Sequence, residues 1–166
     1  MDKSSTAAAY LKELEAEYGS TRKCLERIPD SKFDFRPHPT SMPMNYLALL
    51  VAEIPRWIQL IIETGDIDFA TFKHADIKTN QELVDHFEEN MTGARKALKD
   101  STPEQLERTF YLKADGKVLF SEKAATYIGP TLNHWVHHRG QLTVYMRICE
   151  IPVPSIYGPS ADDKQY

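Results

Sequence analysis

The chain has 166 residues, the usual length of one domain with a single hydrophobic core. Apolar residues make up 42% and charged residues 27%, and a net charge of −4 without any basic run argues against nucleic-acid binding. The first residues form no apolar signal region, and we expect no apolar stretch long enough to span a bilayer. Cys24 and Cys149 lack CxxC spacing, which indicates reduced, buried thiols. We therefore expect one cytoplasmic domain over residues 1–166, with no nucleic-acid or membrane partner.

Two amphipathic helices are predicted in the first 64 residues. Apolar side chains recur at 3.6-residue spacing from about Thr6 to Ile28, and Pro29 ends this first helix. Residues 30–43 include three prolines and predict a long connection across one end of the fold. The second helix is expected from about residue 43 to 64. Pro55 lies inside it and predicts a kink, and Gly65 ends it.

After an irregular connector at residues 66–78, a third helix is predicted from a capping box. Thr79 and Glu82 stand at the N-cap and N3 positions of that box. Its apolar stripe runs to Leu98, and His86 beside the stripe is expected to have no function. Thr102 followed by Pro103 predicts one further short turn of helix.

The period then changes from helical to alternating. Apolar and polar residues alternate on both sides of Asp115-Gly116, a strong turn signal, so we expect a hairpin and no other strand. Ser121 is expected to cap the last helix, from Glu122 to about Cys149, with an interruption at Gly129-Pro130. The tail from Ile151 should be extended. The predicted fold class is all-α: a four-helix up-and-down bundle with long crossover connections and a small β-hairpin before the last helix.

The candidate chemistry lies in the last helix, where His134 and His138 are four residues apart. On a helix this spacing places both imidazoles on one face, one turn apart. Neutral imidazole is a good ligand for Zn, Ni and Fe, so the pair is half of a metal site. The same spacing is also found in core histidines that are satisfied by hydrogen bonds. His137 lies about 100° around the helix and should point away.

The segment His134-Trp-Val-His-His138-Arg-Gly-Gln-Leu, followed by Tyr145-Met-Arg and by Val153-Pro-Ser-Ile-Tyr157-Gly-Pro, closely resembles the C-terminal signature of the DinB-like family. A second match is the stretch from Leu47 to Trp57. The likeness covers nearly the whole chain. It implies a damage-inducible helical-bundle protein of a family regarded as metal-dependent enzymes.

The resemblance implies a divalent metal on three histidines, two of which match His134 and His138. The third family position aligns with Leu50 here, so one ligand is missing. A catalytic zinc site normally has three protein ligands and one open position. Glu53, one turn further on, is a conceivable replacement, although a solvated or salt-bridged carboxylate is the alternative. Gln141 and Tyr145 share the histidine face and are expected in the pocket as hydrogen-bond partners.

Two other residues of the family motif are expected to be structural. Arg139 should pair with a carboxylate from another helix or from the tail, and Tyr157 should dock on the bundle. Gln141 should orient a neighbouring side chain.

For function, the resemblance implies a metal that activates a low-molecular-weight thiol, as in thiol-dependent transferases, or a metal-activated water, as in hydrolases. The alternative is a metal-free homodimer that binds a small molecule or is associated with stress. Its pocket would be lined by Leu50, His134, His138 and Tyr145. Apolar residues outside the predicted inward stripes favour a homodimer; they are Val51, Ile62, Val136, Val144 and Met146. The sequence identifies no substrate.

Overall fold

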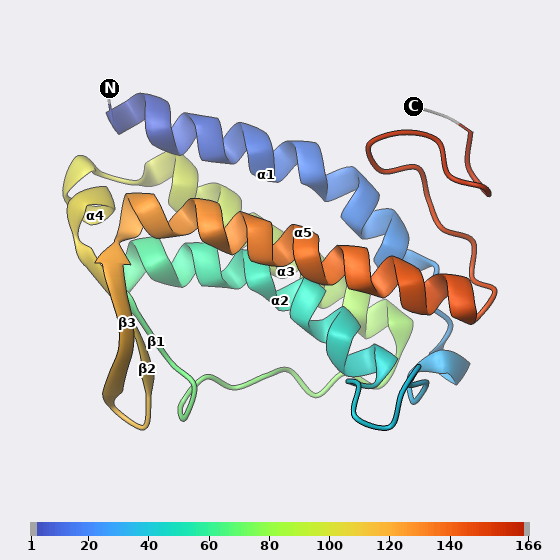
Figure 1. The fold of residues 1–166 in the computed structure, drawn as a ribbon. Coiled ribbons are helices and arrows are strands. Elements are labelled where there is room, and N and C mark those ends of the chain that lie inside the picture. Colours follow the sequence, from blue (N-terminus) through green and yellow to red (C-terminus); the bar gives the residue numbers. More distant parts are fainter. Residues whose placement is uncertain (1–2, 165–166) are drawn as a thin grey trace.

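Four long helices lie side by side along the molecule, and a short helix and a small sheet stand at one end (Figure 1). The computed structural model describes residues 3–164. The long helices are α1 (Lys3–Glu26), α2 (Met44–Glu63), α3 (Asn80–Asp100) and α5 (Ala124–Ile148). The other elements are η1 (Asp30–Lys32), α4 (Pro103–Glu107), β1 (Asp66–Asp68), β2 (Thr109–Ala114) and β3 (Lys117–Lys123). The protein is therefore mostly helical, as predicted.

The core forms where α2 packs against α3 and α5, and where α1 packs against the same two helices. By length and composition alone α2 could cross a membrane, which the sequence analysis did not anticipate. Most of its side chains are buried among the other helices, a property it shares with core helices of soluble proteins. Leu47, Ile54, Ile58 and Ile61 are almost fully buried in this core, as is Trp135 of α5.

The long connection between α2 and α3 follows from their direction. Both helices run the same way, so residues 69–79 return along the side of α2 before α3 begins (Figure 1). Thr79 and Glu82 then form the predicted capping box, and Thr102 with Gln105 forms a second one at α4. Pro55 and Pro130 lie inside α2 and α5, and each helix continues through its proline. The last helix is therefore one element and not two.

The sheet is larger than the sequence predicted, and its boundary with α5 differs. The β2–β3 hairpin turns at Asp115 and Gly116, which both have positive φ, as the Asp-Gly signal requires. The prediction of no other strand was wrong, because β1 pairs in parallel with β2. Ser121 does not cap α5, since it pairs with Tyr111 in the ladder and the helix begins at Ala124.

Candidate functional site: a histidine pair on α5

His134 and His138 point their Nε2 atoms at each other, 2.8 Å apart. Both side chains are half-buried, and their ring centroids are 4.5 Å apart. The four-residue spacing on α5 creates this arrangement, because it stacks the two side chains on one helix face. A separation of 2.8 Å means that one Nε2 donates a hydrogen bond and the other accepts it.

Gln141 determines which nitrogen carries the proton. Its Oε1 atom lies 2.8 Å from Nδ1 of His138, and an amide oxygen can only accept, so the Nδ1–H of His138 donates. The Nε2 atom of a neutral His138 then carries a lone pair and accepts the Nε2–H of His134. A hydrogen bond to the far nitrogen is how proteins fix the orientation of a ligating imidazole. The predicted orienting role of Gln141 agrees with this geometry.

Burial favours the neutral form of both imidazoles. Desolvation lowers the pKa of His134, and neighbouring His138 and His137 lower it further. Desolvation also lowers the pKa of His138; the hydrogen bond with Gln141 opposes this effect and His137 adds to it. A neutral imidazole is the form that binds metal ions and accepts protons. His137 itself is exposed, as predicted.

On α2, the face opposite the histidines is aromatic and apolar. The Trp57 ring lies 5.8 Å from the ring of His134, and the Trp135 indole donates a 2.8 Å hydrogen bond to the Val51 carbonyl oxygen. Because α2 and α5 run in opposite directions (Figure 1), positions C-terminal to Trp135 on α5 lie beside positions N-terminal to Val51 on α2. Half-buried Leu50 therefore falls at the level of His138. A leucine side chain offers no donor to a metal.

Tyr145 lies further along the same helix face and closes a neighbouring cavity. Its hydroxyl donates to the Met42 carbonyl oxygen at 3.1 Å, which attaches α5 to the loop before α2. A cavity of about 410 Å³ lies between this loop and α5, and Gln141, Val144 and Tyr145 line it. Gln141 thus contacts His138 and also lines the cavity. A small molecule bound there would contact the side chain that hydrogen-bonds His138.

Glu53 has partners other than His134 and His138. Its carboxylate, 1% exposed, accepts hydrogen bonds from His74 Nδ1 at 2.5 Å and from the Ala75 backbone N–H at 2.9 Å, and His86 Nε2 lies 3.3 Å away. These bonds hold the connector and α3 against α2. To act as a third metal ligand, Glu53 would have to lose these hydrogen bonds. His86, expected to have no function, helps to hold this buried carboxylate.

The residues present supply two converging nitrogen donors. Within residues 3–164, no group of three or more His, Cys, Asp or Glu side chains is arranged to hold a metal ion. The pair therefore fits the two-histidine half of a site, and it does not fit a complete three-ligand site.

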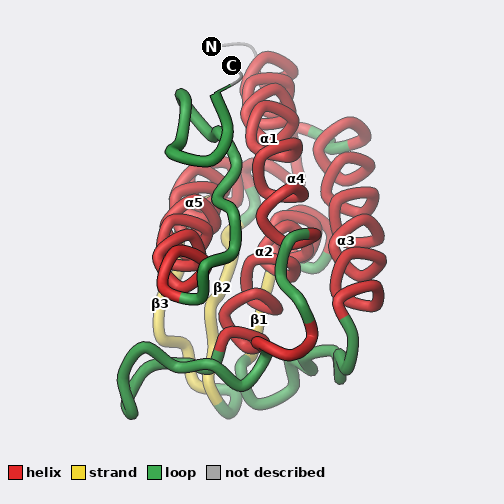
Figure 2. Tube along the Cα trace, turned by 90° about the vertical axis from the view of Figure 1, so that its right-hand side faces the viewer, coloured by secondary structure: helices red, strands yellow, loops and turns green. Residues whose placement is uncertain are grey.

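Arg139 and Tyr157 join the last helix to α1 and the tail. The Arg139 guanidinium, 2% exposed, lies 2.6 Å from the Glu17 carboxylate and donates to the Tyr157 hydroxyl at 2.8 Å. The Tyr157 hydroxyl in turn donates to Glu17 at 3.0 Å. Figure 2 shows the tail lying beside α1 and α5. Arg139 thus pairs with a carboxylate of another helix, and Tyr157 docks on the bundle, as predicted.

These features define a helical protein with a paired-histidine face on its last helix. The model of the DinB family matches residues 1–165, and the chain belongs to the DinB family. Its fold is similar to the crystal structure of a DinB-like protein from Bacillus subtilis, with a TM-score of 0.69 and 19% identity over 87% of this chain and 96% of that one. A DinB-like protein from Bacillus cereus gives a TM-score of 0.66 and 21% identity over 89% and 95%. Among curated proteins, none matches the sequence.

Proposed function

We propose that this DinB-family protein binds a divalent transition metal, Zn, Ni or Fe, through His134 and His138 together with a small ligand from solution. We further propose that it acts in the cytoplasm as a transferase or hydrolase on a small molecule. The observation that carries the proposal is the convergence of the two Nε2 atoms at 2.8 Å. A low-molecular-weight thiol is the ligand class that suits the remaining positions, because thiolate sulfur is a strong ligand for these metals.

The chain's own residues prepare the site in three ways. Desolvation lowers the pKa of both imidazoles and so favours their neutral, metal-binding form. Gln141 holds His138 with its Nε2 lone pair directed at His134. The adjoining cavity of about 410 Å³ offers space for a substrate beside the pair. When bound, a metal would lower the pKa of a coordinated thiol or water and so supply a nucleophile at neutral pH.

A second candidate function is metal-free binding of a small molecule at the same face. The specific observation in its favour is Leu50 at the level of His138, together with the lack, among residues 3–164, of a third His, Cys, Asp or Glu side chain grouped with the pair. In that case His134 and His138 would serve as hydrogen-bonding groups for the ligand, since each ring can donate or accept.

Elemental analysis of the purified protein and calorimetric titration with Ni²⁺ or Zn²⁺, each with and without glutathione, decide between the two. The metal proposal expects one ion per chain, bound more tightly when the thiol is present. His134→Ala and His138→Ala should abolish binding, and His137→Ala is the matched control that should retain it. Wild-type protein that binds no metal under either condition would refute the metal proposal and leave the second candidate.

A further inference from the structure

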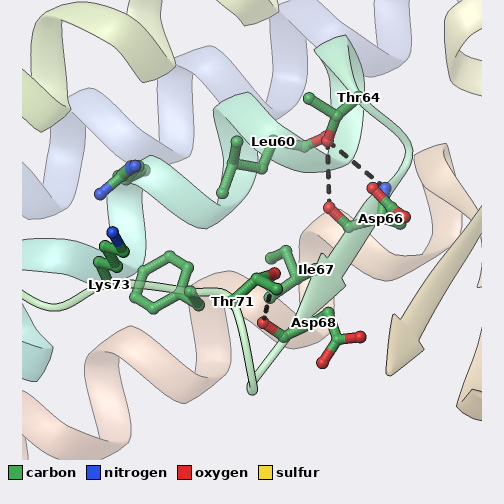
Figure 3. A pocket seen from close by; sticks show the side chains of 9 residues that line it. Leu60, Thr64, Asp66, Ile67, Asp68, Thr71 and Lys73 are labelled. Carbon is green, nitrogen blue, oxygen red and sulfur yellow. Dashed lines mark hydrogen bonds between the residues drawn. The ribbon is translucent and has the colours of Figure 1, made fainter. Parts of the chain in front are cut away.

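A second cavity, of about 350 Å³, lies beside α2 near β1 (Figure 3). It is formed by the C-terminal half of α2, by β1 and by the first part of the connector. Leu60 and Ile67 give it apolar walls, and Phe72 and Thr71 come from the connector. Its volume is within the usual range for small-molecule sites.

Arg56 lines this cavity with its donors unused. The guanidinium lies 5.2 Å from the centroid of the Phe72 ring, and it makes no hydrogen bond or ion pair with any described residue. The other arginines differ. Each donates to a carboxylate or to a backbone carbonyl; they are Arg22, Arg27, Arg36, Arg95, Arg108, Arg139 and Arg147. Arg56 is half-buried, and its N–H donors are available to bind a planar oxyanion.

Lys73 supplies a second positive charge to the cavity, and it too has no ion-pair partner among the described residues. The two acidic residues of the lining already have partners. Asp66 accepts from Lys113 at 2.6 Å. Asp68 accepts backbone N–H bonds from Ala70, Asp115 and Gly116 at 2.7–3.0 Å. Figure 3 shows Lys73 at the opposite end of the cavity from Asp66 and Asp68, so the end near Lys73 carries the unpaired positive charge.

The aromatic contacts connect this cavity to the histidine pair without merging the two sites. Phe72 lies 6.0 Å from Trp57, and Trp57 lies 5.8 Å from His134, measured between ring centroids. Trp57 thus stands between them. A ligand that orders Arg56 and Phe72 will change the environment of this indole, so that binding has an optical signal.

We propose that this cavity binds a small organic anion, with its carboxylate or phosphate head held by Arg56 and Lys73 and its apolar body against Leu60 and Ile67. The anionic head group would accept paired hydrogen bonds from the guanidinium and would be attracted by the second cation. The apolar part of the ligand would pack against the apolar wall. The proposal does not depend on a metal at His134 and His138.

The test is calorimetric titration and tryptophan fluorescence on protein that has been treated with EDTA and then dialysed into EDTA-free buffer, with four probes: benzoate, phenyl phosphate, inorganic phosphate and neutral benzyl alcohol. Benzoate or phenyl phosphate should bind at least about tenfold more tightly than benzyl alcohol, the loss expected when one charge-assisted hydrogen bond is missing. The better of the two identifies the head group. Equal binding of inorganic phosphate would contradict the role of the apolar wall.

Variants then assign the site. Arg56→Gln should weaken binding of the best probe at least about tenfold, and Arg56→Lys should weaken it less because it keeps the charge. Lys73→Gln should weaken it by a smaller factor, and exposed Lys12→Gln is the matched control that should not change it. Thermal melts confirm that each variant is folded. No binding of either aromatic anion, or binding that Arg56→Gln leaves unchanged, overturns the proposal.

Discussion

At the scale of single residues, Leu50 limits what the histidine pair can hold. By the antiparallel register of the two helices it lies on α2 at the level of His138, and the resemblance to the DinB-like family predicts a third histidine at this position. A third nitrogen donor would leave one open position, which is the ligand count of catalytic zinc sites. We therefore expect that a histidine in place of Leu50 would turn this two-donor face into a three-donor site.

Leu50→His should create or strongly tighten a transition-metal site. Without metal, the polar ring lowers the free energy of unfolding by about 1 kcal/mol or more. A metal ion that binds only the folded state, at a concentration well above Kd, raises the free energy of unfolding by more than this amount. Thermal melts with and without Ni²⁺, beside calorimetric titration, measure both effects. Leu50→Gln is the control, since it is polar without an imidazole. Equal metal affinity in the wild type and in Leu50→His would show that another residue already supplies the third ligand.

Arg139 is the second residue whose environment leads to a measurable expectation. Its guanidinium and the Glu17 carboxylate are buried together, and each compensates the desolvation of the other. Arg139→Met should cost about 3 kcal/mol of unfolding free energy, because it leaves a buried carboxylate without its partner. Adding Glu17→Gln should recover part of that loss. Urea unfolding of the two single variants and the double variant measures this coupling, and a cost of Arg139→Met below about 1 kcal/mol would contradict it.

At the scale of elements, the helices could be predicted because their apolar stripes are long, and the hairpin because Asp115-Gly116 specifies its turn. The short β1 could not, since three residues with one buried side chain, Ile67, carry no period. It exists because β2 offers an unpaired edge. For the site, the four-residue histidine spacing was sufficient to place the pair on one face.

The partners of Glu53 were missed for a different reason. His74 and His86 are 21 and 33 residues away in the chain, and only the return of the connector along α2 brings them together. The available signal was a carboxylate inside the apolar run from Val51 to Ile54, since a buried charge requires partners. The same connector brings Lys73 to the cavity that Arg56 lines, which sequence spacing alone does not reveal.

The Glu53 contacts predict how stability depends on pH. Burial alone would raise the pKa of this carboxyl, but hydrogen bonds from His86, Ala75 and His74 outweigh it and lower the pKa. In the unfolded chain this carboxyl has a pKa of about 4.3, so on acidification it takes up a proton before the folded carboxyl does. The stabilisation by the charged Glu53 is therefore fully present above pH ~4.3. It is lost as the pH falls through the lower pKa of the folded state.

Denaturant unfolding of Glu53→Gln between neutral pH and pH 3 tests this expectation. The variant should be less stable at neutral pH and should lose less stability than the wild type on acidification. Exposed Glu63→Gln is the matched control and should follow the wild-type curve. Parallel curves for the wild type and Glu53→Gln would show that the connector contacts do not depend on the charge of Glu53.

At the scale of the whole molecule, the structure changes which apolar residues can form a dimer interface. Val51, Ile62 and Met146 are buried in the core and cannot contact a second chain. Val144 and Ile148 are more than half exposed, and they lie one turn apart on the outer face of α5. A two-fold contact through this face would bury both pairs of side chains.

We predict a homodimer through this face of α5. Light scattering at micromolar concentration should give twice the mass of one chain, and Val144→Glu should reduce it to the mass of one chain by placing a charge in the apolar contact. Leu119→Glu, at an equally exposed apolar position on β3, is the control and should leave the dimer intact. A wild-type protein with the mass of one chain would refute the prediction.

The contacts that hold the connector between β1 and α3 also predict how slowly proteases cleave it. Irregular surface segments are the preferred sites of nicking, and Lys73 lies exposed in this one. However, Asp68 holds the start of the segment to the hairpin turn, and Glu53 holds Ala75. Trypsin should therefore cut slowly after Lys73 in the folded protein. Asp68→Ala should speed this cut severalfold in a timed digest followed by mass spectrometry, while the overall melting temperature changes little, because only the local opening becomes easier.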